Sequence, residues 1–325
     1  MPANLTPQYF EAEKRYRRAS TPQERIEALE EMLSVMPKHK GTDKLRAELR
    51  TKIARSYDEA QRKPVIGRKG SLLYYIKKEG AGQVVLVGLP NVGKSQLVSV
   101  VTEASPQVAD YPFTTQAPLP GMLNFKNIQI QLVDVPAITA PHVESWLPNI
   151  LKNADLLLVV VDLTRDPVAQ METIIERLEK FRIRLFDKET EPGTVRKRAL
   201  LLGNKGDLEG AGEGYKRLSS QYEGKLPIIR VSARVGSGLG ELGENLYKAL
   251  KIIRVYTKAP GEKPDLTAPT VVKKGSTVEE LAEYVHKDFR SQLKYAQVWG
   301  SGKFDGQRVK RDYVLQEGDV VELHI

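Results

Sequence analysis

Residues 88–95 of this chain, Gly-Leu-Pro-Asn-Val-Gly-Lys-Ser, match the pattern G-x-x-x-x-G-K-S. A β-branched run, residues 83–87, precedes the pattern, and residues 96–101 can continue as a helix. A strand, a glycine-rich loop and a helix N-terminus together surround a phosphate with backbone N–H groups. In such a loop Lys94 would reach the β- and γ-phosphates, and the Ser95 hydroxyl would bind Mg²⁺. The alternative is a plain glycine turn in an α/β domain, but such a turn would not require Lys94 and Ser95 after the second glycine.

Length and composition describe an ordinary globular chain of two or three domains. It has 325 residues and no cysteine, so disulfides and thiolate sites are excluded and a reducing cytoplasm is expected. The first residues have neither a basic leader nor an apolar run, so we expect no signal peptide. The longest apolar run, residues 156–161, is too short to cross a bilayer, and no membrane partner is expected.

The net charge of +9 is concentrated before the phosphate loop. Residues 38–78 carry 13 basic and 4 acidic side chains, whereas residues 255–325 carry 11 of each. A basic patch gains affinity for nucleic acid by displacing phosphate counterions, so an acidic partner, most simply structured RNA, is expected. A solvated helix face is the alternative for the same residues.

The N-terminal pattern predicts helices. Thr21-Pro22-Gln23-Glu24 is a capping box with proline at the first helical position, and Pro37 ends the helix that follows it. A second helix is expected from Thr42 to about residue 57, packed on the first as an antiparallel hairpin. Residues 7–19 predict a shorter helix.

From residue 83 to about 251, strands alternate with helices, which predicts a mostly parallel sheet covered on both faces. The strands expected are 83–88, 121–126, 128–134, 155–162, 199–204 and 227–231, and the helices are 94–104, 143–152, 168–183, 213–222 and 239–251. Residues 187–198 are expected to form a surface loop. After residue 252, short strands and one helix starting at the capping box Thr277–Glu280 predict a small mixed sheet. His286 and Trp299 are expected to be packing residues in it.

Polar motifs follow several of these strands, where open α/β sheets bind their ligands. Asp134 ends strand 128–134 and is placed to hold Mg²⁺. Asn204-Lys205-Gly206-Asp207 follows strand 199–204, and Ser232-Ala233-Arg234 follows strand 227–231. Asp207 can accept two hydrogen bonds from a guanine edge, which adenine cannot donate. The loop before residue 121 contains Phe113-Thr114-Thr115, where a threonine can close on Mg²⁺ and γ-phosphate. Together these motifs predict a guanine-nucleotide site.

The motifs resemble those of translation-factor-class GTPases, and within them the Obg-related group. Residues 111–115, Tyr-Pro-Phe-Thr-Thr, resemble the first switch of that group. Nearly the whole chain resembles the developmentally regulated GTP-binding protein (DRG) family. Segments 253–258, 294–300 and 318–322 resemble that family's C-terminal TGS domain, which is of β-grasp type. The resemblance implies GTP hydrolysis and work near ribosomes or structured RNA.

The predicted organisation is α/β: a basic helical hairpin region in residues 1–80, a P-loop GTPase domain in 81–251 and a β-grasp TGS domain in 252–325. The expected ligands are GTP or GDP, Mg²⁺ and K⁺. The residues expected to bind the nucleotide are Gly88, Pro90, Asn91, Val92, Gly93, Lys94, Ser95, Gln96, Phe113, Thr114, Thr115, Asp134, Ala137, Asn204, Lys205, Asp207, Ser232, Ala233 and Arg234. Those expected to hold the metal are Ser95, Thr115 and Asp134, and those expected to act in catalysis are Lys94, Thr115 and Asn91.

Two departures from the family pattern affect these expectations. Ala137 replaces the glycine of Asp-x-x-Gly, and Ile138 stands where many GTPases have a water-orienting glutamine, so slow hydrolysis is expected. Asn91 matches an asparagine of potassium-activated relatives, which suggests stimulation by K⁺. About forty residues separate Asp162 from Asn204, too few for the small domain that the family inserts there.

The leading hypothesis is a slow GTPase that acts as a ribosome- or RNA-associated switch in the cytoplasm. A second hypothesis is a nucleotide-sensing module with little hydrolysis that recruits a protein partner through the TGS domain. A third, an ATPase on the same fold, conflicts with Asp207, because related proteins that prefer ATP lose this acidic residue.

Overall fold

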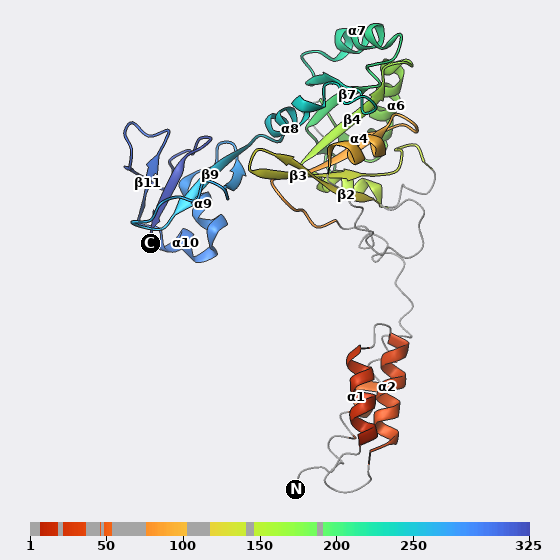
Figure 1. The fold of residues 1–325 in the computed structure, drawn as a ribbon, viewed down its shortest axis with the longest axis vertical. Helices are drawn as coiled ribbons and strands as arrows, with labels where there is room; N and C mark the ends of the chain where they lie inside the picture. Colours follow the sequence, from red (N-terminus) through yellow and green to blue (C-terminus); the bar gives the residue numbers. More distant parts are fainter. Residues whose placement is uncertain are drawn as a thin grey trace. The chain divides into compact units, whose positions relative to one another are not determined.

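The computed structural model describes residues 7–18, 22–36, 46, 49–53, 76–102, 118–140, 146–186 and 191–325 (Figure 1). The chain divides into two compact units, Met1–Leu72 and Leu73–Ile325. The three-domain division predicted from the sequence is a finer partition and stays a prediction.

The first unit contains two packed helices, α1 (Pro7–Arg18) and α2 (Pro22–Ser34). Tyr9 and Ala12 of α1 are buried against Leu29 and Met32 of α2, and Arg15 pairs with Glu31 at 3.0 Å across the same contact. The shorter helix predicted for residues 7–19 is therefore present over Pro7–Arg18, and residue 19 lies outside the described residues. Residues 46 and 49–53 are helical, but the rest of the second hairpin helix, residues 42–57, lies outside the described residues. The hairpin of helices 22–36 and 42–57 stays a prediction.

The second unit is built on a six-stranded sheet with strand order β2-β3-β1-β4-β7-β8. Only β2 is antiparallel to its neighbour; the other pairs are parallel. The strands are β1 (Gln83–Gly88), β2 (Leu119–Phe125), β3 (Ile128–Asp134), β4 (Leu156–Asp162), β7 (Ala199–Asn204) and β8 (Ile228–Arg230). β1, β4 and β7 are almost wholly apolar because a parallel sheet is covered on both faces.

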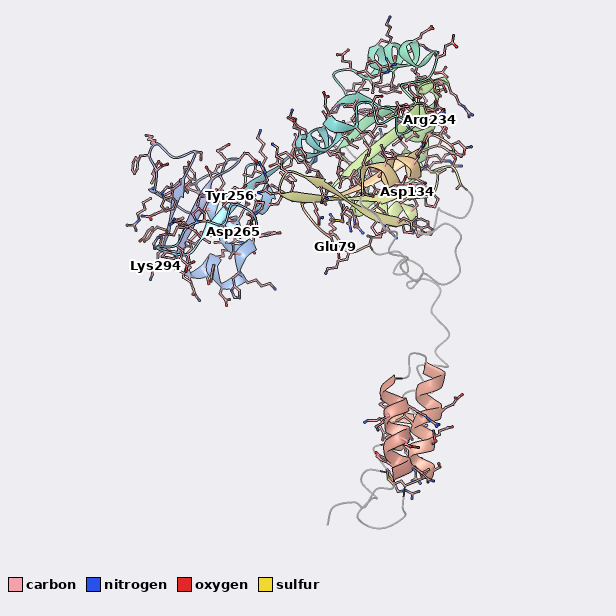
Figure 2. All side chains as sticks on the ribbon, in the orientation of Figure 1. Glu79, Asp134, Arg234, Tyr256, Asp265 and Lys294 are labelled. Atoms are coloured by element: carbon pink, nitrogen blue, oxygen red, sulfur yellow. The ribbon has the colours of Figure 1, made fainter. Side chains whose placement is uncertain are left out.

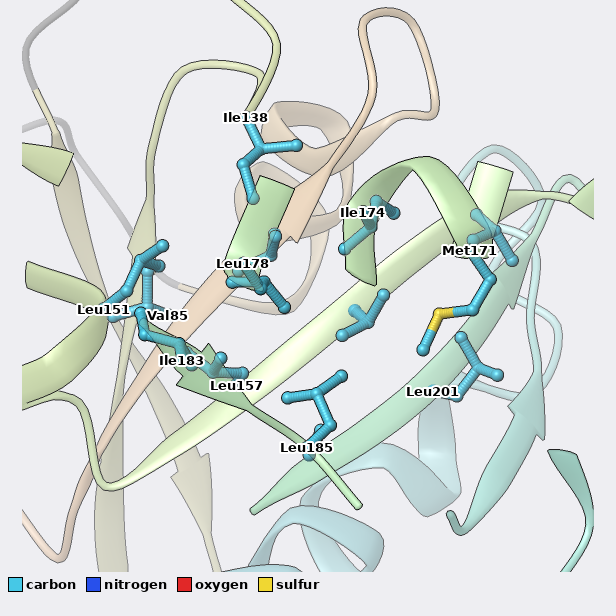
Figure 3. Close-up of a cluster of buried hydrophobic side chains, with 14 of the residues drawn as sticks. Val85, Ile138, Leu151, Leu157, Met171, Ile174, Leu178, Ile183, Leu185 and Leu201 are labelled. Atoms are coloured by element: carbon cyan, nitrogen blue, oxygen red, sulfur yellow. The ribbon is translucent and has the colours of Figure 1, made fainter. Parts of the chain in front are cut away.

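Helices pack on both faces of this sheet. One core cluster joins the sheet to α5 (Leu147–Asn153), α6 (Pro167–Lys180) and α7 (Ala211–Tyr222), and Figure 3 shows part of it. The other joins the opposite face to α4 (Lys94–Val101) and α8 (Leu242–Leu250). The mostly parallel sheet with helices on both faces, predicted from the alternation of strands and helices, is therefore confirmed.

Differences from the predicted boundaries have local causes. α6 begins after Asp166, whose carboxylate accepts from the N–H groups of Val168 and Ala169, and it ends before Arg182, which has a left-handed φ of 57°. β2 ends before the turn at Lys126, where φ is 52°. Residues 187–198 are only partly a loop: β6 (Val195–Arg196) pairs with β5 (Ile183–Arg184), and residues 187–190 lie outside the described residues.

The C-terminal part is a five-stranded mixed sheet with order β10-β9-β13-β11-β12. Its strands are β9 (Ile252–Lys258), β10 (Thr270–Lys273), β11 (Tyr295–Trp299), β12 (Gln307–Val309) and β13 (Val320–His324). α9 (Val278–Val285) starts at the predicted capping box, in which Thr277 and Glu280 bind each other's backbone N–H groups. The buried face of α9, with Leu281 and Ala282, closes one side of this sheet.

A second short helix, α10 (Lys287–Gln292), follows α9 and was not predicted. His286 is its N-cap, accepting from the Asp288 N–H at 3.3 Å with 59% of its side chain exposed, so the packing role predicted for His286 is wrong. Trp299 is partly buried beneath the Lys258 ammonium, which lies 4.3 Å from its ring centre.

The turn of the β2–β3 hairpin contacts the C-terminal sheet. The Asn127 amide donates to the Tyr256 hydroxyl and to the Leu266 carbonyl, both at 3.0 Å, and accepts from Arg254 at 2.5 Å. Glu317 joins the same cluster, because it accepts from Tyr247 of α8 and from Arg254. Within the described parts of the chain, none of the helices has the length and apolar character needed to span a bilayer.

Candidate functional site

The loop between β1 and α4 has the backbone that its glycines require. A Cβ atom at Gly88 would lie 2.6 Å from the Val160 carbonyl oxygen, and one at Gly93 would lie 2.4 Å from the Asn204 amide nitrogen. Gly93 also has a left-handed φ of 92° and is the N-cap of α4. Because glycine brings no capping side chain, the first N–H groups of α4 are left for another acceptor. The loop can therefore receive an anion.

Lys94 is buried at the base of this loop. Its ammonium lies 3.4 Å from the Gly88 carbonyl oxygen and 3.3 Å from that of Leu89. Burial lowers the pKa of Lys94, and the nearby charge of Asp134 opposes this shift. An ammonium surrounded by loop carbonyls and largely removed from water is placed to bind a phosphate that enters the loop.

Ser95 and Asp134 face each other across the loop, and Figure 2 shows Asp134 beside α4. The Ser95 hydroxyl donates to Oδ2 of Asp134 at 2.5 Å. The other oxygen, Oδ1, is buried and has no hydrogen-bond partner among the described residues. Burial raises the pKa of Asp134, while the bonds from Ser95 and the charge of Lys94 lower it. A hydroxyl and a carboxylate with a free oxygen match the hard oxygen ligands that Mg²⁺ prefers.

The segment after β3 is anchored to the phosphate loop. The Ile138 N–H donates to the Gly88 carbonyl at 3.2 Å, and its side chain is 2% exposed within the core (Figure 3). Ala137 has no left-handed φ, so alanine fits this backbone without strain. The Ile138 side chain therefore offers no polar atom to the loop, as expected for the residue that stands in place of glutamine.

Asn204 joins the phosphate loop to the loop after β8. Its side chain is 1% exposed; its amide nitrogen donates to the Val92 carbonyl at 2.8 Å, and its oxygen accepts from the Ala233 N–H at 3.0 Å. Three segments far apart in sequence, residues 88–95, 204–207 and 232–234, are therefore held together at the carboxyl ends of β1, β7 and β8.

Asp207 lies exposed beside this junction. A hydrogen bond from the Ser232 hydroxyl and the charge of Arg234 hold the pKa of Asp207 below its ordinary value. It is therefore an ionised acceptor at neutral pH. Arg234 is exposed, and Figure 2 labels it on the same domain as Asp134.

Sequence reasoning left one residue of the site without a role. Asp162, the last residue of β4, is buried and pairs with Lys205 at 2.6 Å. Its position at a strand end, the same feature that selected Asp134, could have identified it. Phe113, Thr114 and Thr115 lie outside the described residues, so their predicted contacts stay predictions.

Comparisons with known proteins agree with this geometry. The family described as "50S ribosome-binding GTPase" matches residues 83–190, and the TGS domain family matches residues 253–325. An uncharacterized GTP-binding protein of Methanocaldococcus jannaschii is 31% identical, over 93% of each chain. Developmentally-regulated GTP-binding protein 2 of Homo sapiens is 24% identical, over 92% of this chain and 98% of its own.

A solved structure also shares the fold. The YchF GTPase of Schizosaccharomyces pombe has a TM-score of 0.53 at 14% identity, covering 76% of this chain and 99% of that protein. At this identity the likeness concerns the fold alone. The sequence relatives decide the family: the chain belongs to the GTP-binding proteins that include the developmentally regulated GTP-binding proteins, and it combines a GTPase domain with a C-terminal TGS domain.

Proposed function

We propose that this protein binds GTP through the junction described above, hydrolyses it slowly and acts as a ribosome- or RNA-associated switch in the cytoplasm. The observation that carries the proposal is the pair of hydrogen bonds made by the Asn204 side chain. One is to Val92 in the phosphate loop, and the other is to Ala233 in the loop after β8, which is predicted to contact the base. A single ligand with phosphates at one end and a base at the other would contact both loops.

Residues of the phosphate loop bind the triphosphate in this proposal. The backbone N–H groups of the loop 88–96, which Pro90 alone lacks, and the Lys94 ammonium balance its negative charge, and Ser95, Thr115 and Asp134 would hold Mg²⁺. When bound, the metal would neutralise charge that develops between the β- and γ-phosphates. The free Oδ1 of Asp134 supports this assignment, because a buried carboxylate oxygen without a partner is costly unless a ligand satisfies it.

Guanine selectivity is assigned to Asp207. A carboxylate can accept from both the ring N–H and the 2-amino group of guanine, and adenine has neither donor. Ser232 and Arg234 of the loop after β8 lie near enough to Asp207 to lower its pKa, which supports the placement of Asp207 at the base pocket together with Lys205, Ala233 and Arg234.

Slow hydrolysis follows from the residues near the γ-phosphate end. Since Ile138 is a core residue, the attacking water must be oriented by another group, such as Thr115. A K⁺ ion beside Asn91 would neutralise charge between the β- and γ-phosphates. The burial of Ile138 favours the second candidate function, a nucleotide-sensing module with little hydrolysis that recruits a protein through its TGS domain. Single-turnover hydrolysis of GTP by the purified protein distinguishes the two.

Ribosome association is supported by the name of the family that matches residues 83–190, and RNA binding by the basic segment 38–78. The test is co-sedimentation of the full chain with purified ribosomes. We expect binding with a non-hydrolysable GTP analogue and release with GDP. Equal sedimentation in both states would contradict a switch, and no sedimentation in either would contradict ribosome association.

A further inference from the structure

The Asp162 carboxylate is completely engaged inside the protein. Only 3% of its side chain is exposed; Oδ2 accepts from the Lys205 ammonium at 2.6 Å. Oδ1 accepts from the backbone N–H of Thr164 at 2.9 Å and from its hydroxyl at 2.7 Å. Because both oxygens are occupied, Asp162 is a poor candidate for a metal ligand or a general base.

The pair is ionic. Burial alone would raise the pKa of Asp162, but the hydrogen bonds from Lys205 and Thr164 hold it below its ordinary value. A second cation, Arg165, lies 3.9 Å away at the surface. Buried ion pairs often stabilise a fold no more than apolar residues of similar volume, so such a pair suggests a role in orienting a group.

Lys205 and Asp207 belong to the same loop but are held in opposite directions. Lys205 has a left-handed φ of 61° and reaches back to Asp162 at the end of β4, whereas Asp207 lies on the side of Ser232 and Arg234, which follow β8 and lower its pKa. In the sheet, β4 and β8 are the two neighbours of β7, one on each side. The two charged groups, only two residues apart in sequence, are thereby separated.

We propose that Asp162 is a positioning residue that keeps the Lys205 ammonium away from Asp207, so that the Asp207 carboxylate stays available for the base of the nucleotide. Without Asp162, the Lys205 ammonium would be free to turn and pair with Asp207. The Asp207 carboxylate, which would accept from the guanine 2-amino group and ring N–H, would then be paired with the Lys205 ammonium of the same protein. Anchoring also removes the rotamer freedom of Lys205, which binding would otherwise have to restrict. This inference rests on the proposed function.

The test compares the full-chain protein with the variants Asp162→Asn, Lys205→Met and the double variant, by calorimetric titration with GDP and with IDP in the presence of Mg²⁺. IDP carries hypoxanthine, which lacks the 2-amino group. For Asp162→Asn we expect GDP affinity to fall about tenfold, equivalent to losing one good interaction. We also expect its preference for GDP over IDP to decrease. In the double variant no ammonium remains to compete, so the ratio of GDP to IDP affinity returns to the wild-type value, while the loss of Lys205 from the base pocket weakens the binding of both nucleotides.

A matched control lies at the other end of the same strand. Asp155, just before β4, pairs with Lys78 at 2.5 Å, and Asp155→Asn should leave both affinities within about twofold of wild type, the effect of a half-exposed ion pair far from the ligand. Thermal unfolding of each variant reports folding separately. If Asp162→Asn does not fold, the double variant, which leaves no unpaired buried charge, still has to show the wild-type preference.

The outcomes separate the two proposals. Equal losses for GDP and IDP in Asp162→Asn, unchanged GDP affinity, or a lost preference in the double variant would overturn the role of Asp162. A wild-type protein that does not bind GDP, or that does not prefer it over IDP, would contradict the proposed guanine site itself.

Discussion

Asp207 is the residue whose substitution should change the base that is bound. It is exposed, and Ser232 and the charge of Arg234 lower its pKa, so its ionised carboxylate is accessible to a ligand. We expect Asp207→Asn to weaken GDP binding by about 100-fold or more, because guanine donors would face an amide N–H₂ group. Xanthine nucleotides should gain affinity, since their 2-oxo group accepts from that amide. Titration with GDP and XDP measures both effects.

Asp265→Asn is the control for this substitution. Asp265 is also an exposed aspartate with a lowered pKa, caused by hydrogen bonds from Thr267, but it lies after β9 in the TGS domain. This variant should bind GDP as wild type does. Retained GDP affinity in Asp207→Asn, or wild-type binding of ATP as strong as of GTP, would show that Asp207 does not select the base.

The ionised Asp162 should make the free energy of unfolding depend on pH in the acid range. Its folded pKa lies below the unfolded value of about 3.9. The ionised group therefore stabilises the folded state above that unfolded value, and this stabilisation is lost as pH falls through the lower folded pKa. We expect the free energy of unfolding of the wild type to decrease below about pH 4, and this part of the decrease to be smaller in Asp162→Asn. Denaturant titrations across the acid range measure it; parallel curves for the two proteins would contradict the assignment.

Asn91 has two possible reasons to be asparagine. Its φ is 62°, a left-handed value that asparagine tolerates better than most residues, and its exposed amide is also the group predicted to hold K⁺. Asn91→Gly keeps this backbone and removes the amide. We expect wild-type GTP hydrolysis to be faster in KCl than in NaCl at equal ionic strength, and Asn91→Gly to lose the difference.

Comparison with Asn91→Ala separates backbone from side chain. Alanine removes the amide and also strains the left-handed turn, so its nucleotide affinity should be the lower of the two. Equal rates in both salts for the wild type would reject potassium stimulation. A potassium preference that survives in Asn91→Gly would exclude the Asn91 amide from the cation site.

Among the elements, the strands were easier to predict than the ends of the helices. The apolar runs of β1, β4 and β7 identify buried parallel strands by composition alone. The helix ends depend on single residues, such as the left-handed Arg182 after α6, which no periodicity indicates. α10 escaped prediction because five of its six residues are exposed and only Phe289 packs on the core, so the helix lacks an apolar stripe, and it begins at a histidine cap.

The β2–β3 hairpin should contribute to the stability of the GTPase–TGS contact through Asn127. The three hydrogen bonds of its amide, to Tyr256, Leu266 and Arg254, are all lost in Asn127→Ala. We expect a loss of about 1–3 kcal/mol in the free energy of unfolding, because Arg254 then loses an acceptor. Chemical denaturation of the full chain measures this loss.

Asn124 in the same hairpin provides the comparison. Its side chain accepts one exposed hydrogen bond, from Gln129 at 2.8 Å, so Asn124→Ala should cost less than about 0.5 kcal/mol. If both variants lose equal stability, the hairpin as a whole, and not its contact with the TGS domain, is responsible.

For the whole molecule, motif and topology predicted most of the candidate site, and side-chain pairing supplied the rest. Residues 88–95, 134, 204–207 and 232–234 were predicted to lie at one edge of the sheet, because each stands at the carboxyl end of a parallel strand. Strand ends alone do not predict which polar groups at that edge form hydrogen bonds or ion pairs with each other. The Asp162–Lys205 ion pair and the two hydrogen bonds of the Asn204 side chain depend on rotamers and on strand order, which cannot be read from a single sequence.

The charge of the whole chain leads to the last prediction, which concerns RNA. The excess of basic residues lies in segment 38–78, while the TGS domain is balanced, so the N-terminal region should supply most non-specific RNA affinity. Neutralising Arg46, Arg50, Lys52 and Arg55 together should weaken binding of a structured RNA and flatten its dependence on salt, by about one unit of slope per lost phosphate contact. The control neutralises four exposed lysines of the TGS domain, Lys263, Lys273, Lys274 and Lys303. It removes the same charge and should change the salt slope little.

Filter binding over a range of KCl concentrations measures the slope for both sets of variants. An unchanged slope in the first set would mean that segment 38–78 is a solvated face, and an equal change in both would mean that net charge alone attracts RNA.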